Sequence, residues 1–367
     1  VAMQGRAKYN EYIDGGRNAR LLEHSVAYRV LIRGYQDSDG DGLGDLTGLI
    51  SRLDYIAELG VDVIVLSLYE LTHQGDQAKP DDLMSLSTRL GTMLQLIDLI
   101  SRARERRLKI ILSIPASLAE AEVCDYWLKK GVAGFVPYQD PLLSDYRPGG
   151  SLNLKKLKRD LVAKARHDTT MIELESETTL RSVTLCAGDR YREEVAKMLA
   201  TIMLTMPGVP CIYQGQEIGT PSSRQRFGRA ELNAGTPMYW SDDEYAGFSE
   251  VAPQLTLDRI FQVVNVEAQD NDPASVLSYY RQLIALRKSS LILQDGAIKF
   301  VGDRGNILCY RRSLDGYQLQ VTGNLSSRYV APAAEIAKGE LVCSSYIGRG
   351  DLAKPLAPYE AVVTRVD

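Results

Sequence analysis

The amino-acid sequence predicts an α/β fold, in which a (β/α) barrel, shortened or incomplete, is followed by a small antiparallel β domain. Three observations predict it. Short runs rich in Val, Ile and Leu, such as 61–68 and 109–114, have the composition of strands that are buried on both faces. Amphipathic helical patterns alternate with these runs, which is typical of a parallel sheet with crossover helices. In the last third of the chain, the helical patterns give way to short alternating runs.

The predicted elements repeat in order along the chain. A β-rich stretch at 27–32 precedes a helix at 46–59, whose apolar residues recur at helical spacing and which ends before Gly60. Further helices are expected at 93–106, 118–130, 154–167 and 194–206, and strands at 132–136, 170–174 and 209–213. A β/α rhythm of about six or more units favours a barrel over an open sheet.

Domain boundaries follow from the same patterns. Residues 1–24 are expected to form an N-terminal extension, residues 25–290 the barrel, and residues 291–367 a C-terminal β-sandwich domain. Strands of this last domain are expected at 297–301, 306–312 and 318–323, where short runs alternate as they do in antiparallel sheets.

Composition excludes several classes of protein. With 43 basic and 47 acidic residues the net charge is −4, and no basic stripe indicates nucleic-acid binding. The chain as given has neither an opening signal peptide nor an apolar run of about 18 residues that would cross a membrane. The five cysteines lack the paired spacing of zinc sites.

An acidic, glycine-rich run at 37–45, DSDGDGLGD, predicts a calcium-binding loop. Calcium takes six to eight oxygen ligands, and alternate residues of a tightly turning loop can aim oxygens at one ion. The candidate ligands are the carboxylates of Asp37, Asp39, Asp41 and Asp45 and the carbonyl of Leu43. An EF-hand would need Glu at its twelfth position, which is Gly48 here. The alternative is an acidic surface turn without an ion.

Four blocks of the sequence resemble the α-amylase family of glycoside hydrolases, in particular its oligo-1,6-glucosidase and maltase branch. They lie at 37–68, 196–219 (AKMLATIMLTMPGVPCIYQGQEIG), 235–249 and 264–288. The resemblance implies a TIM-type barrel with a C-terminal β sandwich, and a calcium loop at the first β/α connection. It also implies hydrolysis of α-glucosides by two carboxyl groups, one a nucleophile and the other an acid/base.

The acids that this resemblance implies are only partly present. The family's nucleophile follows the fourth strand in a Gly-Phe-Arg-x-Asp context, where this chain has Val136 for the Arg and Tyr138 for the Asp. Asp140 lies two residues further on, nearly 7 Å away along an extended strand. The acid/base Glu is expected at the end of the fifth strand, although alternating Glu residues are also typical of an exposed strand end. The candidates for the three acids are therefore Asp140, then Glu173 or Glu175, and Asp189 after the seventh strand.

Two functional hypotheses follow. The first is a catalytically inactive amylase-like protein with a binding, scaffolding or assembly role, because the acids are displaced and the insertion after the third strand is absent. In these features, and in the block 76–90, the chain resembles the heavy-subunit ectodomains of heteromeric amino-acid transporters. Its partner would be a membrane transporter or a larger assembly. The alternative is an α-glucosidase or maltase with relocated acids, which would bind an α-glucoside.

Overall fold

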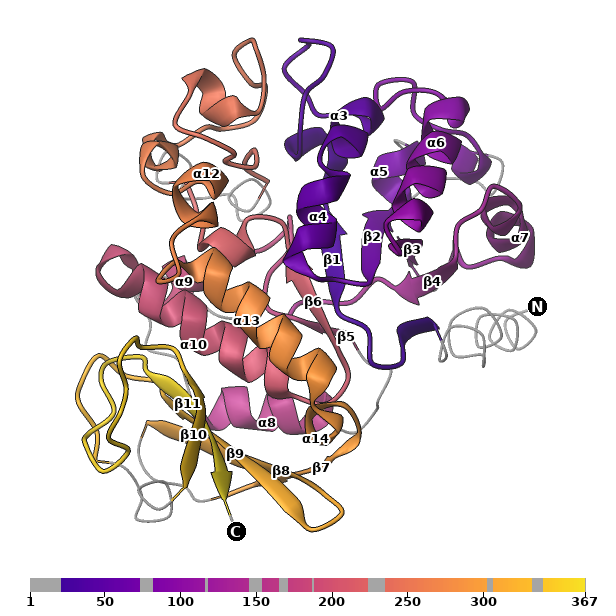
Figure 1. Cartoon of the computed structure of the whole chain (residues 1–367). Helices are drawn as coiled ribbons and strands as arrows, with labels where there is room; N and C mark the ends of the chain where they lie inside the picture. Colours follow the sequence, from indigo (N-terminus) through magenta and orange to yellow (C-terminus); the bar gives the residue numbers. More distant parts are fainter. Residues whose placement is uncertain are drawn as a thin grey trace.

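A six-stranded parallel sheet forms the centre of the protein, with helices along its outer face (Figure 1). The computed structural model describes residues 21–72, 82–115, 118–144, 154–164, 171–186, 188–223, 235–301, 306–331 and 339–366. The strands are β1 (Ala27–Val30), β2 (Val63–Ser67), β3 (Lys109–Ile114), β4 (Gly134–Pro137), β5 (Met171–Glu173) and β6 (Val209–Tyr213). Their order in the sheet is β4-β3-β2-β1-β6-β5, and every neighbouring pair is parallel. The predicted α/β class is confirmed.

Helices connect these strands. They are η2 (Ile32–Gly34), α3 (Leu46–Ser51), α4 (Leu53–Leu59), α5 (Leu68–Thr72), η3 (Asp82–Met84), α6 (Met93–Glu105), α7 (Ala121–Lys129), α8 (Leu154–Lys164), α9 (Ser182–Cys186), η5 (Gly188–Tyr191) and α10 (Arg192–Thr205). After β6 come η6 (Gln216–Ile218), η8 (Glu244–Gly247), η9 (Arg259–Gln262), α12 (Val266–Asp270), α13 (Val276–Ser289) and α14 (Leu291–Asp295). The helix predicted at 46–59 is interrupted at Arg52, whose ψ of 8° separates α3 from α4.

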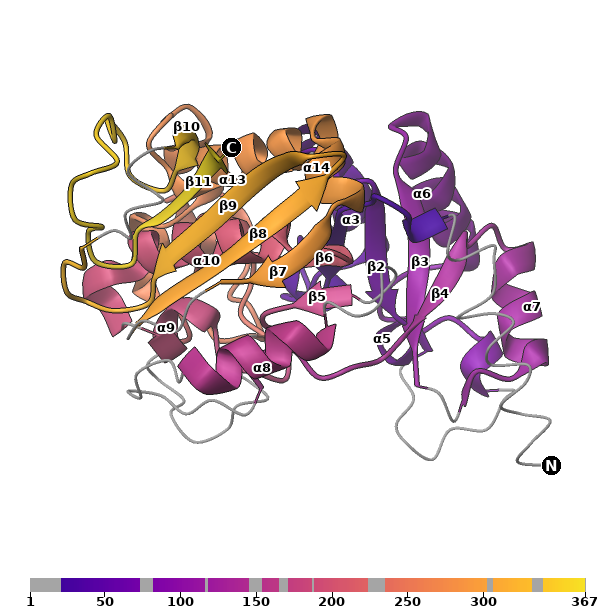
Figure 2. The same ribbon diagram turned by 90° about the horizontal axis from the view of Figure 1, so that it is seen from below.

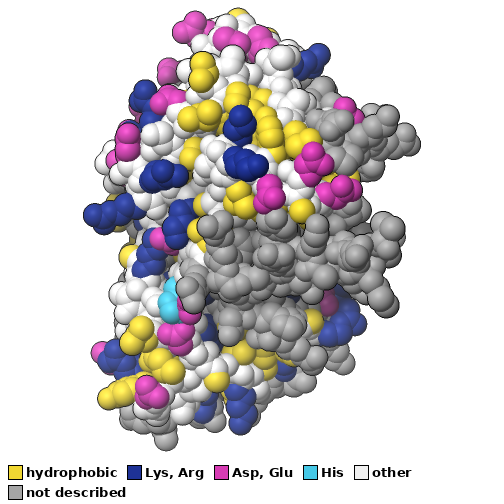
Figure 3. All heavy atoms as spheres, turned by 90° about the vertical axis from the view of Figure 1, so that its right-hand side faces the viewer, with side chains coloured by type: hydrophobic (Ala, Val, Ile, Leu, Met, Phe, Trp, Pro, Cys, Tyr) yellow, Lys and Arg dark blue, Asp and Glu magenta, His cyan; other side chains and the backbone are white. Residues whose placement is uncertain are grey.

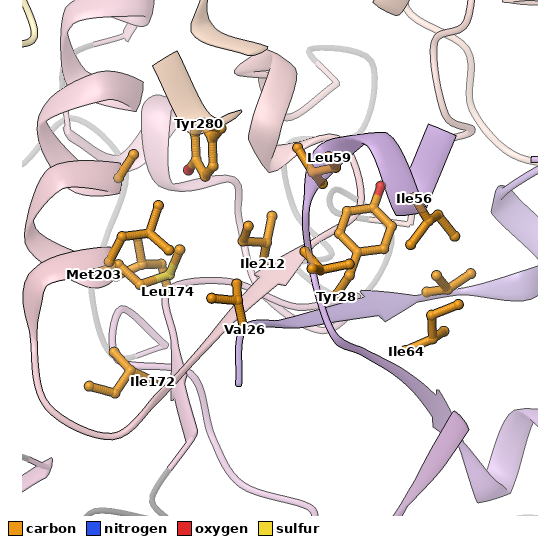
Figure 4. Packing of buried hydrophobic residues seen from close by; sticks show 14 of the residues in the cluster. Val26, Tyr28, Ile56, Leu59, Ile64, Ile172, Leu174, Met203, Ile212 and Tyr280 are labelled. Carbon is orange, nitrogen blue, oxygen red and sulfur yellow. The ribbon is translucent and has the colours of Figure 1, made fainter. Parts of the chain in front are cut away.

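The strands bury both of their faces, because successive side chains point to opposite sides. One face packs under the helices: Tyr28, Ile64, Ile172 and Ile212 meet side chains such as Ile56 of α4 and Met203 of α10 (Figure 4). The other face forms a second apolar cluster, made of Ala27, Val63, Val65, Ile111, Val136, Met171, Val209 and Cys211 together with Leu22. Burial on both faces explains why these strands are near-continuous apolar runs.

One buried arginine shows how strongly the sheet curves. From β1, Arg29 donates to Glu173 of β5, with Nε and Oε1 3.0 Å apart, and to Ser113 of β3, with Nη1 and Oγ 3.1 Å apart. Four strand spacings separate β3 from β5, which would be about 19 Å in a flat sheet. The sheet therefore curls around this guanidinium and forms a partial barrel.

The barrel is incomplete between β4 and β5. Within the described part of the chain, each of these two strands pairs with only one neighbour. The segment after β4 crosses part of the gap, because the Leu142 amide donates to the Glu173 carbonyl over 2.7 Å and the Gln139 side chain donates to the Met171 carbonyl over 3.0 Å. Lys164 in turn donates to the Gln139 side chain. The expectation of a shortened barrel is confirmed.

An antiparallel sheet follows the barrel, as predicted. Its strands are β7 (Ala297–Phe300), β8 (Ile307–Leu314), β9 (Tyr317–Asn324), β10 (Glu340–Ser344) and β11 (Ala361–Val366), in the order β10-β11-β9-β8-β7. The described residues of this region form one sheet, without the second sheet that a sandwich requires. The sheet lies against α10 instead (Figure 2). Arg312 of β8 fixes this contact by donating to the carbonyl of Thr205, the last residue of α10, over 2.7 Å.

The surface carries charges of both signs. On the face shown in Figure 3, Lys and Arg side chains are interspersed with Asp and Glu around exposed hydrophobic side chains. Among the residues described, no helix combines the length and apolar character needed to cross a membrane.

Breaking the buried ion pair is expected to destabilise the barrel. Glu173→Gln should lower the free energy of unfolding by about 3–5 kcal/mol, because Arg29 then keeps a buried charge without a counterion. Removing both charges in Arg29→Met/Glu173→Met should cost less than this single change. Urea denaturation measures both.

An exposed pair provides the control. Arg102 and Asp98 are paired at i, i+4 on α6 with both side chains about half exposed, so Asp98→Asn should cost less than about 1 kcal/mol. Equal losses for Glu173→Gln and Asp98→Asn would show that the barrel does not depend on its interior pair.

Candidate functional site

A cavity of about 980 Å³ opens at the carboxyl ends of the barrel strands. Residues that follow five of the six strands, or end them, contribute to its lining: Leu31 after β1, Ser67 of β2, Pro115 after β3, Tyr138 after β4, and Glu177 with Thr178 after β5. In (β/α) barrels this face carries the reactive groups, because the βα loops converge there. The volume is within the range of pockets that bind small molecules.

Two carboxyl groups line the cavity. Glu70 of α5 accepts hydrogen bonds from the backbone amides of Ile32 and Arg33, each over 2.9 Å. Burial raises the pKa of Glu70 to about 7, and the charge of Glu177 acts in the same direction, against the opposing effect of the two amides and of Arg33. Glu70 is thus a carboxyl group that can hold a proton near neutral pH, while Glu177 is half-buried and lines the same cavity.

Tyr138 occupies the end of β4, where the resemblance places a nucleophilic carboxylate. Its side chain is half-buried in the cavity wall, and its hydroxyl lies 3.3 Å from the Thr178 hydroxyl. Burial raises the pKa of Tyr138, and Glu177 adds to this shift. The phenol is therefore neutral near neutral pH, and it can donate a hydrogen bond.

Two of the predicted acids form internal ion pairs. Glu173 points into the barrel toward Arg29, and burial alone would lower the pKa of that arginine, but the Glu173 carboxylate raises it. Glu175 pairs with Arg181 over 3.0 Å and accepts a hydrogen bond from the Ser182 amide. Both carboxylates are at most 3% exposed, so this segment is not an exposed strand end.

The other two predicted acids lie elsewhere. Asp140 is exposed and is not among the residues lining the cavity. Asp189 belongs to the short helix η5, and its side chain lies outside the described part of the structure. The structure therefore does not bring Asp140 and Glu173 together around one cavity. Glu175 is likewise occupied, because it pairs with Arg181 in the interior.

The sheet order corrects the numbering of the strands. Because β5 pairs with β6, and β6 with β1, β5 takes the seventh place of a barrel and not the fifth. Residues 182–186 form helix α9, so no strand directly precedes Asp189. The third acid of the family, which follows the seventh strand, therefore corresponds in space to the segment 175–177. Within that segment Glu177 lines the cavity, although sequence analysis favoured the two preceding Glu residues.

Three of the predicted calcium ligands converge. Carboxylate oxygens of Asp37, Asp39 and Asp45 lie within 4.8 Å of one another, and two of these residues are buried. Burial raises the pKa of Asp39, and the neighbouring carboxylates contribute to that shift. Burial would also raise the pKa of Asp37, but hydrogen bonds from Ser249 and backbone amides lower it overall. Three hard oxygen donors at this spacing fit a divalent cation such as Ca²⁺.

Asp41 does not join the three converging carboxylates, and Asp45 has a second role in the loop. Asp41 is exposed and accepts a hydrogen bond from the Leu43 amide over 2.8 Å, outside the group of three carboxylates. Asp45 also caps α3, because its side chain accepts from the Gly48 amide. An ion at this loop would neutralise the converging carboxylates and tie the first β/α connection together.

The acidic loop is packed tightly against the backbone of the cavity wall. The Gly44 amide donates to the Arg33 carbonyl over 2.8 Å, and a side chain at Gly44 would place its Cβ 2.1 Å from the Ile32 carbonyl oxygen. A Cβ at Gly48 would lie 1.9 Å from the Gln36 carbonyl oxygen. Only glycine allows this close approach.

Comparison with known proteins gives consistent relatives. The family model described as "Alpha amylase, catalytic domain" matches residues 29–117 and 148–296, more than half of the chain. An oligo-1,6-glucosidase of Parageobacillus thermoglucosidasius is 23% identical over 553 aligned residues, covering 94% of this chain and 98% of that protein. A trehalose-6-phosphate hydrolase of Escherichia coli is 35% identical over 210 residues, covering 47% of this chain and 38% of that protein.

Among solved structures, a trehalose-6-phosphate hydrolase of Bacillus licheniformis superposes with a TM-score of 0.80 at 18% identity, covering 94% of this chain and 99% of that one. This likeness concerns the fold. An alignment of 553 residues is longer than the 367 residues of this chain, so the match bridges internal segments that the chain lacks. The gap between β4 and β5 is one place where the structure shows such a loss.

Metal binding at the acidic loop is expected to stabilise the fold. Chelation with EDTA should lower the melting temperature and added Ca²⁺ should restore it, because an ion that binds only the folded state stabilises it by about 2.7 kcal/mol at a hundred times its Kd. Asp39→Asn should abolish this response, since it removes an exposed member of the converging group. Scanning calorimetry measures the shift.

Asp41→Asn is the matched control, because Asp41 is equally exposed in the same loop but lies outside the group. It should keep the response to Ca²⁺. An unfolding curve that does not move on chelation would contradict the metal site.

Proposed function

The chain belongs to the α-amylase family, and from that premise we propose that it acts on an α-glucoside bound in the cavity at the carboxyl ends of its strands. The observation that carries this proposal is the presence of two carboxyl groups, Glu70 and Glu177, in one cavity of suitable size, with the pKa of Glu70 raised to about 7. Pairs of carboxyl groups with different protonation states are what glycoside hydrolysis requires.

In the proposed reaction, protonated Glu70 is the general acid. It donates its proton to the glycosidic oxygen as the bond to the anomeric carbon breaks, and the Glu177 carboxylate stabilises the positive charge that develops on the sugar. Water then adds its hydroxide to the anomeric carbon, and its remaining proton returns to Glu70. Tyr138 donates a hydrogen bond to a sugar hydroxyl from the end of β4.

A second candidate function is glycoside binding without turnover. The observation that favours it is that the chain places Tyr138 and Val136 at the end of β4, where family hydrolases carry a carboxylate and its arginine. The protein partner expected from the sequence, a transporter or a larger assembly, would then use the cavity as a recognition site. We further propose Ca²⁺ as the ion of the acidic loop in either case.

Removing the Glu177 carboxylate is expected to slow turnover strongly. Glu177→Gln should lower kcat/KM for p-nitrophenyl α-glucoside or maltose by about 10²–10⁴-fold, because the amide cannot stabilise the developing charge. Release of p-nitrophenol or glucose measures the rate. The matched control is Glu122→Gln, an exposed position on α7.

The competing arrangement, with Asp140 as the essential acid, predicts the opposite order of activity loss for the two variants. Turnover that survives Glu177→Gln and is lost in Asp140→Asn would reject the cavity pair. Absent turnover in the unaltered chain, combined with measurable binding of maltose, would favour the second candidate function.

The pH profile tests the role of Glu70. Because the acid must be protonated, kcat/KM should fall as the pH rises through about 7, the value to which burial raises the pKa of Glu70. In Glu70→Gln the group no longer titrates, so the remaining activity should lose this alkaline decline. An alkaline limb that is unchanged in Glu70→Gln would assign the titration to another group.

A further inference from the structure

We propose that this cavity selects α-glucosides that carry an anionic group, a phosphate or a carboxylate, and that Arg33 and Arg89 bind that group at its rim; the inference rests on the proposed function. It adds a substrate class that the carboxyl pair alone does not specify.

The two arginines are held on either side of one loop segment. Both line the cavity and both side chains are exposed. The Arg33 carbonyl accepts from the Gly44 amide over 2.8 Å, and the carbonyl of Leu90, next to Arg89, accepts from the Leu46 amide over 2.9 Å. The backbone hydrogen bonds therefore fix the positions from which both guanidinium groups reach the rim.

Among the described residues, neither guanidinium forms a hydrogen bond or ion pair, in contrast to the buried Arg29 and Arg181. Arg33 acts on Glu70 through its charge, but Glu70 takes its hydrogen bonds from backbone amides. Each guanidinium thus keeps N–H donors for a ligand. Planar guanidinium groups match phosphate and carboxylate groups through paired hydrogen bonds.

The charge distribution also orients the ligand. The charge of Glu177, which also acts on Glu70, repels an anion from the part of the cavity that this carboxylate lines. The anionic group would therefore lie against Arg33 and Arg89, and the neutral glucosyl ring would lie toward Tyr138 and Glu177. An anionic group on the leaving part of the glycoside satisfies both conditions.

Binding of matched neutral and anionic glycosides tests this inference. Isothermal titration calorimetry on the full chain would compare trehalose with trehalose 6-phosphate, and maltose with maltobionate. For any ligand that the unaltered chain hydrolyses, the Glu177→Gln variant is used instead. The anionic member of at least one pair should bind about tenfold tighter at low ionic strength. A preference within the first pair identifies phosphate, and within the second pair carboxylate.

Arg33→Gln/Arg89→Gln should reduce this preference to near equality, and each single variant should lose part of it. Both positions are exposed, so the variants are expected to fold. The control for the single variants is Arg104→Gln on α6, which removes one exposed arginine charge away from the cavity. The control should keep the preference, and added salt should weaken it.

Each remaining outcome is decisive. Equal affinities in both pairs, or a preference that persists in the double variant, would overturn the anion site while leaving glycoside binding intact. Failure of every glycoside to bind would overturn the proposed function itself.

Discussion

The barrel depends on the ion pair between Arg29 and Glu173. A curved sheet without two of its strands cannot close through backbone hydrogen bonds alone, and here one guanidinium connects β1 to β5 and β3 through its side chain. The desolvation of two charges makes such a pair a costly way to gain stability, but it fixes geometry well. The position of β5, and with it the segment that carries Glu177 into the cavity, follows from this contact.

The local elements of the fold were predictable, while the connection between distant ones was not. The strand at 209–213 was predicted to the residue, because a run buried on both faces contrasts sharply with its flanks. The pairing of β5 with β6 joins residues about 40 positions apart and leaves no local signal. Strands were therefore numbered by their order along the chain, and β5 was placed fifth instead of seventh. Strand β10 was also missed, since it is only partly buried and its apolar pattern is short; β11 was missed although its first four residues are buried.

The candidate site shows the same division. Sequence analysis located the glutamate-rich segment at the end of β5, but residue type alone could not separate the members that form internal ion pairs from the one that lines the cavity. Arg181 sits six residues after Glu175 and neutralises it, and Arg29 comes from a strand 144 residues away. Glu70 gave no signal in the sequence, because its raised pKa arises from burial in a tertiary structure. The acidic loop was recognised because its carboxylates are close together in the chain.

The contact between Gly44 and Arg33 has a thermodynamic consequence. The loop that gathers the three carboxylates is continuous with the backbone that positions both the amides holding Glu70 and the arginine at the cavity rim. A cation at the loop and a glycoside in the cavity would therefore be heterotropic ligands of one structural unit. Linkage requires that whatever factor the ion contributes to glycoside affinity, the glycoside returns to the affinity for the ion.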